Sequence, residues 1–408
     1  MKTVAKLRYI LIVALVSILF RCFFVKNLRS FRFTESAIGR GLGVFRNMVT
    51  NSKVGYEKEL EIASLAVKRA SLLASTLSDI RQTRDSGTQI KEDKSPVTVG
   101  DYAIQAIIIH AIKKNFPDDN IVGEEDSSSL RSDGNSEALL KSEILKAITD
   151  VQEKTETYND KLGKLEDLNI ILDSIDLGNS EGGRRGRFWC LDPIDGTKGF
   201  LRGDQFAVCL ALIEDGNVVL GIIGCPNLPA VITSNENKSG EKGGLYSAVK
   251  NAGSFYSSLY EKDFVPLTQQ RRIEMSTHLS PDNLKVLEGV EKGHSSHSTQ
   301  AQIKKALGFD EETVSKQTIN LDSQVKYCVL AKGQGDIYLR LPVSDTYREK
   351  IWDHAAGSLL VKESGGKVGD MYGNELDFGN GRYLQSKGVI ASNEVIFEKV
   401  IDAVSQVT

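Results

Sequence analysis

Asp192-Pro193-Ile194-Asp195-Gly196-Thr197 follows directly on the apolar run Phe188-Trp189-Cys190-Leu191. The apolar run predicts a strand, so this stretch presents two carboxylates at a strand end. A short turn stiffened by proline can aim Asp192, Asp195 and the Ile194 carbonyl together, which suits Mg²⁺ with its preference for a few carboxylate oxygens. On its own the pattern is more typical of an Asx turn with surface acids. Against a buried strand, however, the repulsion and desolvation of two acids favour a bound cation.

Patterns typical of strands and helices alternate along the rest of the chain, which indicates a mixed α/β or α+β fold. Apolar residues recur at helical spacing from Tyr56 to Ile80, and Asp101 stands at the N-cap position of a helix expected over Tyr102 to Phe116. The stretch from Ser127 to Gly186 is polar and predicts a surface excursion. The other candidates are strands over Ile121-Val122, Phe206 to Ile213, Val218 to Cys225, Val325 to Leu330 and Asp336 to Leu341, and helices over Ala138 to Thr149, Gln300 to Leu307 and Ala355 to Ser364.

Composition indicates a folded enzyme with one large fold or two joined lobes. Of the 408 residues, 40% are hydrophobic and 26% are charged, an ordinary balance for a globular protein. A net charge of −3 provides no overall field for a nucleic-acid backbone, so no nucleic-acid partner is expected. Five scattered cysteines without CxxC spacing indicate neither a disulfide framework nor a zinc site. The interruption at Pro226-Asn227-Leu228-Pro229 suggests three parts: an N-terminal extension over residues 1–50, an α+β metal-binding lobe over 51–228 and an α/β lobe over 229–408.

The N-terminal extension has a composition of its own. Tyr9 to Phe20 is almost unbroken apolar sequence between basic residues, and no acid occurs before Glu35. Three interpretations stay open: a mitochondrial presequence, a signal anchor that contacts a membrane through residues 7–24, and an extension upstream of a start at Met48. The expected location is therefore cytoplasmic or mitochondrial, with membrane anchoring as the alternative.

Other acids and two histidines are weaker candidates when each is taken alone. Glu124-Glu125 is a second acid pair at a strand end, but such a pair is most simply part of a solvated loop. Asp353 lies at the start of a helix candidate and, like Asp101, is most simply an N-cap. His294 and His297 have no cysteine or HExxH partner, so we expect a loop or substrate role for them rather than a zinc site.

Taken together, four segments resemble the motif set of the inositol-monophosphatase-like, lithium-sensitive phosphatases. They are Ser95-Pro96-Val97-Thr98 with Asp101, Gly123-Glu124-Glu125, Asp192 to Thr197, and Trp352-Asp353-His354-Ala355-Ala356-Gly357. The surrounding segments are similar to the fungal 3′(2′),5′-bisphosphate nucleotidases of that superfamily: Glu181 to Cys190, Glu288 to His294, Leu321 to Gln324 and Leu376 to Gly381. The resemblance implies the layered α/β/α/β/α sandwich of that family for the chain beyond the N-terminal extension.

Carried over position by position, the resemblance implies a site for two or three Mg²⁺ ions. The implied ligands are Glu124, Asp192, Asp195, Asp353 and the Ile194 carbonyl oxygen. Asp101 and Thr197 are implied to position the attacking water, with Asp101 accepting its proton through Thr197. The residues implied to surround the substrate are Thr197, His294, Ser323, Lys326, Arg340 and Asp353.

The resemblance also implies the reaction. A monomeric, lithium-sensitive phosphatase is expected to hydrolyse adenosine 3′,5′-bisphosphate to AMP and phosphate, and 3′-phosphoadenylyl sulfate to adenylyl sulfate. One alternative is a phosphatase of inositol phosphates, because the metal motifs do not encode the leaving group. A second alternative is a non-catalytic nucleotide-binding protein, which the intact set of acids argues against.

Overall fold

A computed structural model describes residues 55–85, 95–132, 134–235, 238–277, 280–290, 297–310, 312–342, 344 and 346–408. The residues from Gly55 to Thr408 form one compact unit. The N-terminal extension, with the candidate membrane segment 7–24, lies outside the described residues, and so does His294. Within the described ranges, no helix is both long and apolar enough to cross a bilayer.

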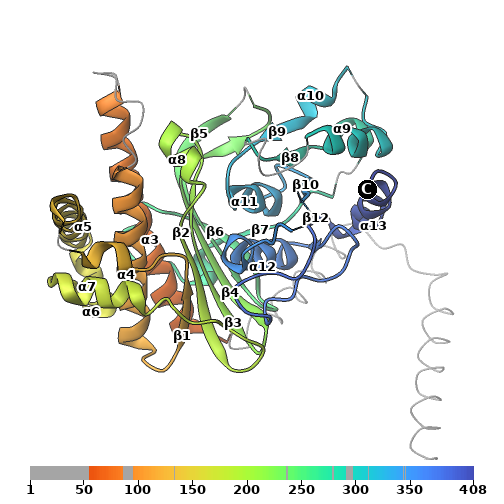
Figure 1. The fold of residues 1–408 in the computed structure, drawn as a ribbon. Helices are drawn as coiled ribbons and strands as arrows, with labels where there is room; N and C mark the ends of the chain where they lie inside the picture. The colour runs from red at the N-terminus through yellow and green to blue at the C-terminus, as the bar shows by residue number, and fades with distance from the viewer. Residues whose placement is uncertain are drawn as a thin grey trace, which may run out of the picture. The chain divides into compact units, whose positions relative to one another are not determined.

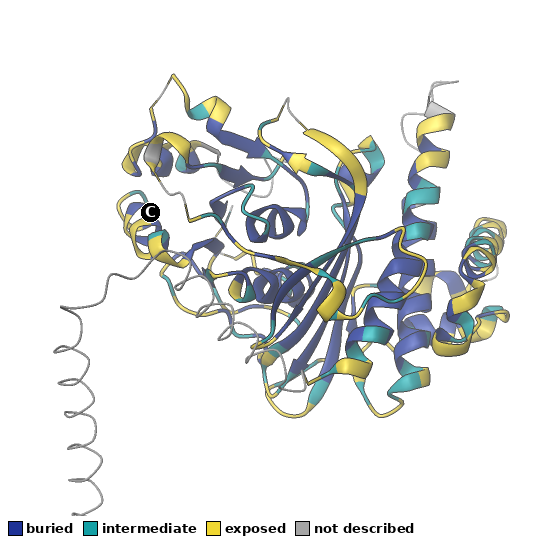
Figure 2. Ribbon diagram, turned by 180° about the vertical axis from the view of Figure 1, so that it is seen from behind, coloured by how far each residue is buried: buried dark blue, intermediate teal, exposed yellow. Residues whose placement is uncertain are grey.

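A seven-stranded sheet in the order β1-β2-β3-β4-β5-β6-β7 forms the centre of this unit (Figure 1). Its strands are β1 (Asn120–Gly123), β2 (Arg187–Asp195), β3 (Ala207–Glu214), β4 (Asn217–Ile232), β5 (Lys238–Val249), β6 (Gly253–Ser258) and β7 (Arg271–Ile273). β1 and β2 are parallel, and every later neighbouring pair is antiparallel. Figure 2 shows that the middle strands are buried. The sequences of these strands are nearly continuous apolar runs, because helices cover both faces of the sheet.

A second, five-stranded sheet has the order β11-β12-β10-β8-β9. Its strands are β8 (Val286–Glu288), β9 (Thr318–Asn320), β10 (Ile337–Arg340), β11 (Gly366–Gly369) and β12 (Val389–Asn393). β12 runs antiparallel to both β10 and β11, whereas β8 runs parallel to its neighbours β9 and β10.

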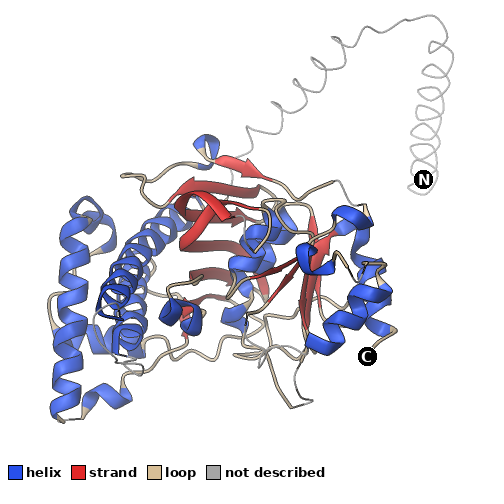
Figure 3. Cartoon of the chain, turned by 90° about the horizontal axis from the view of Figure 1, so that it is seen from above, coloured by secondary structure: helices blue, strands red, loops and turns tan. Residues whose placement is uncertain are grey.

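Helices complete five layers, which Figure 3 shows from above. α3 (Glu57–Asp85) and α4 (Ser95–Asn115) cover one face of the first sheet, and α11 (Val325–Ala331) and α12 (Ala355–Glu363) lie between the two sheets. On the outer face of the second sheet lie α9 (His297–Ala306) and α13 (Glu394–Ser405). The predicted layered α/β/α/β/α sandwich is therefore confirmed. The other α-helices of the described residues are α5 (Asn135–Lys154), α6 (Asn159–Leu162), α7 (Leu168–Asp176), α8 (Thr197–Arg202) and α10 (Val314–Gln317).

The polar stretch between β1 and β2 is the crossover that two parallel neighbours require. It contains α5, α6 and α7, which pack on α4. Ile144, Ile148, Ile171 and Ile175 are fully buried against the rest of the fold. The expected surface excursion is therefore a helical layer with an apolar inner side.

Three local predictions were wrong. Val325 to Leu330 forms α11 rather than a strand. Every residue of this short helix is buried between the two sheets, so its sequence lacks the polar face that marks a helix. Asp101 lies inside α4 rather than at its N-cap. Asp353 ends a short 3₁₀ turn (Ile351–Asp353), and the N-cap position of α12 falls to His354.

The boundary between two lobes near residue 228 stays a prediction. In the structure, β4 runs through this position and ends only at Ile232, with irregular pairing to β5 between Cys225 and Val231.

Candidate active site

A β-bulge turns both aspartates of the Asp192-to-Thr197 stretch toward one side of the first sheet. Asp192 lies opposite Cys209 on β3 and Asp195 lies opposite Ala207, with a register shift between them. Residues three apart in a regular strand point to opposite faces. The extra residue of the bulge restores a common face, which is a known use of bulges next to active sites.

The chain turns sharply after the bulge. Gly196 has a φ of 94°, a left-handed value that favours glycine. A Cβ at this position would lie 2.9 Å from the Cβ of Ser323. The turn therefore needs glycine both for its backbone and for its close approach to the segment before α11.

A cavity of about 320 Å³ opens at this turn. Its walls come from both sheets and from the helices between them. They include nine of the eleven predicted site residues: Glu124, Asp192, Ile194, Asp195, Thr197, Ser323, Lys326, Arg340 and Asp353. Lys198, Gly289, Asp322, Tyr338, Leu339 and Tyr347 line it as well and were not predicted.

The acids of the cavity lack sufficient counter-charge. Asp192 is 2% exposed, and burial, followed by the charge of Glu124, raises its pKa well above the usual range. Burial and the nearby Asp353 raise the pKa of Asp195 to about 7. The Oδ1 atom of Asp192 is buried and has no hydrogen-bond partner among the described residues. A divalent cation would supply that partner, so the donor set fits hard metal ions.

Asp101 lies in α4 and does not line the cavity, but its charge acts on Asp192. Burial, followed by the charges of Glu125 and Glu124, raises the pKa of Asp101 well above the usual range. A carboxylate with a raised pKa is a stronger proton acceptor. Thr197 is the exposed first residue of α8 and lies on the cavity wall.

Arg340 ends β10, and Glu349 holds its guanidinium by two contacts. Arg340 Nε donates to Glu349 Oε1 at 2.8 Å, and Nη2 lies 2.7 Å from Oε2. The same Nη2 lies 3.6 Å from Asp353 Oδ2 and donates to the Tyr347 hydroxyl at 3.2 Å. Two such bonds fix the plane of the guanidinium at the cavity.

Glu349 is itself part of a buried network behind Asp353. Its Oε2 lies 3.2 Å from His354 Nε2, and the Tyr327 hydroxyl lies 2.7 Å from His354 Nδ1. Burial works in the opposite direction, but His354 and Arg340 lower the pKa of Glu349 to about 2. Glu349, Asp353 and His354 have ligand atoms within 4.8 Å of one another. Because Arg340 already neutralises Glu349, this trio is an ion-pair network rather than a second metal site.

Lys326 lies on α11 and supports the segment that carries Ser323. Its side chain is 4% exposed, and Nζ donates to the carbonyl oxygens of Leu321 at 3.0 Å and Ser323 at 2.8 Å. Burial lowers the pKa of Lys326 to about 8. The ammonium therefore holds the backbone of this segment while facing the cavity.

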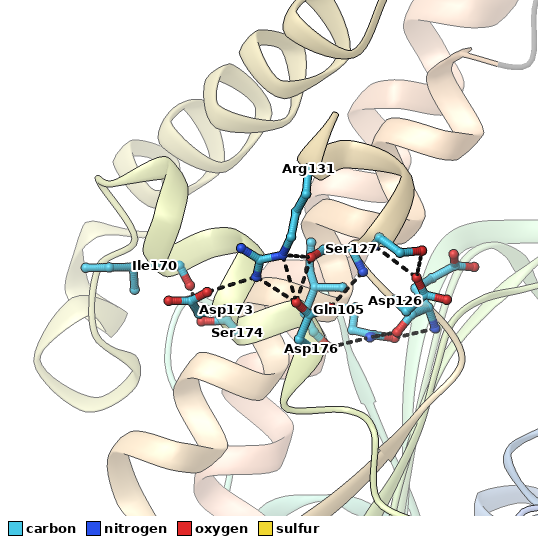
Figure 4. Close-up of polar contacts among 11 residues, drawn as sticks. Gln105, Asp126, Ser127, Arg131, Ile170, Asp173, Ser174 and Asp176 are labelled. Carbon is cyan, nitrogen blue, oxygen red and sulfur yellow. Dashed lines mark hydrogen bonds and ion pairs between the residues drawn. The ribbon is translucent and has the colours of Figure 1, made fainter. Parts of the chain in front are cut away.

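Polar contacts fix the segment after Glu124 to α4 and α7 (Figure 4). Gln105 on α4 accepts a bond from the Glu125 N–H at 3.0 Å and donates to its carbonyl oxygen at 2.6 Å. Asp176 at the end of α7 accepts from the Ser127 hydroxyl at 2.7 Å and from Arg131 Nη2 at 2.6 Å. These partners keep the loop after β1, with Glu124, at the cavity. None of these partners was predicted from the sequence, because they lie far apart in the chain.

Gly357→Ala is expected to destabilise the fold. A Cβ at Gly357 would lie 2.1 Å from Cδ2 of Tyr327, whose hydroxyl is tied to His354. Overpacking of this kind typically costs about 1–3 kcal/mol. Urea denaturation measures the free energy of unfolding, with Gly55→Ala as the control because no atom lies within 4 Å of a Cβ there. Equal stability of the two variants would contradict the close packing of α11 on α12.

Comparisons with known proteins agree on one family. The inositol monophosphatase family model matches residues 56–408. The 3′(2′),5′-bisphosphate nucleotidase 1 of Candida albicans (strain WO-1) is 67% identical over 353 residues, which cover 86% of this chain and 96% of the relative. The 3′(2′),5′-bisphosphate nucleotidase of Emericella nidulans is 47% identical over 369 residues, covering 87% of this chain and 99% of the relative.

Solved structures share the fold. An inositol monophosphatase from Zymomonas mobilis superimposes with a TM-score of 0.51 at 18% identity, over 86% of this chain and 99% of that one. CysQ from Bacteroides thetaiotaomicron, a bacterial member of the same family, has a TM-score of 0.50 at 17% identity, over 84% and 99% of the two chains. By its sequence and its fold, the chain belongs to the inositol monophosphatase family, with the 3′(2′),5′-bisphosphate nucleotidases among its relatives.

Proposed function

We propose that the chain is a Mg²⁺-dependent phosphatase that removes the 3′-phosphate of adenosine 3′,5′-bisphosphate and leaves AMP. The main support for this proposal is that one cavity is lined both by buried acids without enough positive charge beside them and by the cations Lys326 and Arg340. Acids hold a metal, and fixed cations bind phosphate oxygens. The names of the relatives at 67% and 47% identity support a nucleoside bisphosphate as the substrate.

The metal assignment follows from the chemistry of the donors. Family membership implies the use of divalent metal ions. Glu124, Asp192, Asp195, Asp353 and the Ile194 carbonyl oxygen would hold two or three Mg²⁺ ions. Bound ions of this kind lower the pKa of water and neutralise charge that develops on a leaving oxygen.

The remaining steps belong to side chains of this protein. Thr197 orients the attacking water, and Asp101 accepts its proton through the Thr197 hydroxyl. Arg340 and Ser323 orient the nucleotide, with Lys326 supplying positive charge. Hydrolysis of 3′-phosphoadenylyl sulfate to adenylyl sulfate uses the same site, because the 3′-phosphate is again the group removed.

Asp101→Asn tests the proton-accepting step. An amide accepts no proton at neutral pH, so the single-turnover rate should fall by about 10²–10⁴-fold. Mg²⁺ affinity, measured by calorimetry without substrate, should stay within a few-fold of wild type. An equal loss of Mg²⁺ affinity would make Asp101 a metal ligand instead.

A substrate comparison separates the proposed nucleotidase from an inositol phosphatase. The purified chain is assayed for phosphate release from adenosine 3′,5′-bisphosphate and from inositol 1-phosphate at equal concentrations. We expect a higher kcat/KM for the nucleotide, because Arg340 and Lys326 offer cations for its second phosphate. A higher kcat/KM for the inositol phosphate would favour the sibling activity.

A further inference from the structure

Gln324 joins two carboxylate-bearing segments that are far apart in the sequence. Its backbone N–H donates to Asp195 Oδ2 at 2.5 Å. Its side-chain Nε2 donates to the Trp352 carbonyl oxygen at 2.8 Å, and its Oε1 accepts from the Gly357 N–H at 2.9 Å. Asp195 ends β2, whereas Trp352 directly precedes Asp353. One residue therefore contacts the segments that hold both aspartates.

The surroundings of Gln324 leave it little freedom. Its side chain is 1% exposed, and its carbonyl oxygen accepts the Tyr327 N–H at 3.0 Å in the first turn of α11. The preceding Ser323 has a φ of 60°, which residues other than glycine rarely adopt. Such a conformation persists where the surrounding contacts determine it. The backbone and the side chain of Gln324 are thus fixed together.

We propose that Gln324 is a positioning residue that sets the separation of Asp195 and Asp353, and so tunes the affinity of the acids for divalent cations. This inference rests on the metal assignment of the proposed function. Glutamine suits the position because it provides a donor and an acceptor without adding charge to a cluster already rich in carboxylates. Partners behind the ligands typically change metal affinity by about 10–100-fold when they are removed.

The chain offers a matched control in Gln152 on α5. This residue is 6% exposed and also makes one pair of side-chain bonds to the backbone. Its Nε2 donates to the Leu165 carbonyl oxygen at 3.0 Å, and its Oε1 accepts from the Leu165 N–H at 2.7 Å. Gln152 does not line the cavity. Replacing Gln152 therefore shows how much thermal stability is lost with such a pair of bonds when the acids of the cavity are not affected.

The experiment compares Gln324→Met with Gln152→Met in the full chain. Methionine has a similar length and removes both side-chain bonds. Both variants should have a lower Tm than wild type. Only Gln324→Met should bind Mg²⁺ about tenfold or more weakly in calorimetry without substrate. It should also need correspondingly more Mg²⁺ for half-maximal turnover, with a near-normal KM for the nucleotide at saturating Mg²⁺.

Equal Mg²⁺ affinities in the two variants would overturn this inference alone. A wild-type chain that turns over the nucleotide without binding Mg²⁺ would overturn the proposed metal and the inference with it. If Gln324→Met does not fold, Gln324→Asn replaces it. The amide of asparagine is one methylene shorter and should lose at least one of the two bonds, so it should weaken Mg²⁺ binding in the same direction. Wild-type affinity in Gln324→Asn would equally refute the positioning role.

Discussion

Asp192→Asn is expected to abolish turnover and, at the same time, to raise the Tm of the metal-free protein. Loss of a metal ligand should remove several kcal/mol of transition-state stabilisation, which lowers kcat by about 1000-fold or more. Without metal, however, the carboxylate is buried, its Oδ1 has no partner among the described residues, and its neighbours are acids. Burial and the neighbouring acids raise the pKa of Asp192, which means that folding at neutral pH must either protonate this carboxyl or hold its charge against repulsion. An amide avoids that cost, so the free energy of unfolding should increase by about 1–3 kcal/mol.

Thermal melts with EDTA and with Mg²⁺ measure both halves of this prediction. Wild type should gain Tm on addition of Mg²⁺, and Asp192→Asn should gain much less. Asp370→Asn is the control, because Asp370 is 6% exposed but accepts bonds from the Tyr372 and Asn374 N–H groups at 2.9 Å each. That variant should lower the Tm in EDTA. A lower Tm for Asp192→Asn in EDTA would show that the Asp192 charge is already compensated by the protein.

Arg340→Lys is expected to lower kcat/KM for the nucleotide much more than for a small phosphate ester. Lysine keeps the charge but lacks the planar fork that binds Glu349 twice and still faces the cavity. The loss of a charge-assisted contact of about 1.5–3 kcal/mol should lower kcat/KM for adenosine 3′,5′-bisphosphate tenfold or more. Arg340→Ala should lose at least as much and should also be less stable, because it leaves Glu349 buried without its cation.

Hydrolysis of p-nitrophenyl phosphate, a small ester, separates recognition from chemistry. Arg340→Lys should reduce it much less than it reduces nucleotide hydrolysis. Arg69→Lys is the control, since Arg69 is also buried and bonded to Thr155 but lies away from the cavity. It should lower the Tm and leave the ratio of the two substrates unchanged. A parallel decline of both substrates in Arg340→Lys would assign Arg340 to the metal site or the fold instead.

The strand and helix patterns and the acid motifs could be predicted from the sequence because each depends on residues that are close together in the chain. The run before Asp192 predicted β2, and the helical spacing after Tyr56 predicted α3. The bulge that turns Asp192 and Asp195 to one face depends on pairing with β3 and was not predictable from spacing alone.

Residues that act through distant partners were beyond sequence reasoning. Glu349 belongs to no sequence motif. Its role in holding the Arg340 guanidinium could be recognised only from the structure, in which the two side chains form an ion pair. Lys326 belongs to a segment, Val325 to Leu330, for which a strand was expected, but it lies in α11, where its side chain is buried. Buried polar contacts of this kind follow from tertiary packing, which overrides local preference.

Phosphate release from adenosine 3′,5′-bisphosphate, measured with Mg²⁺ and again with EDTA, is the decisive test of a metal-dependent nucleotidase. We expect stoichiometric AMP and phosphate with Mg²⁺, no turnover in EDTA, and recovery when Mg²⁺ is restored. Undiminished phosphate release in EDTA would contradict the metal site at Asp192 and Asp195, and no release under either condition would contradict the proposed substrate.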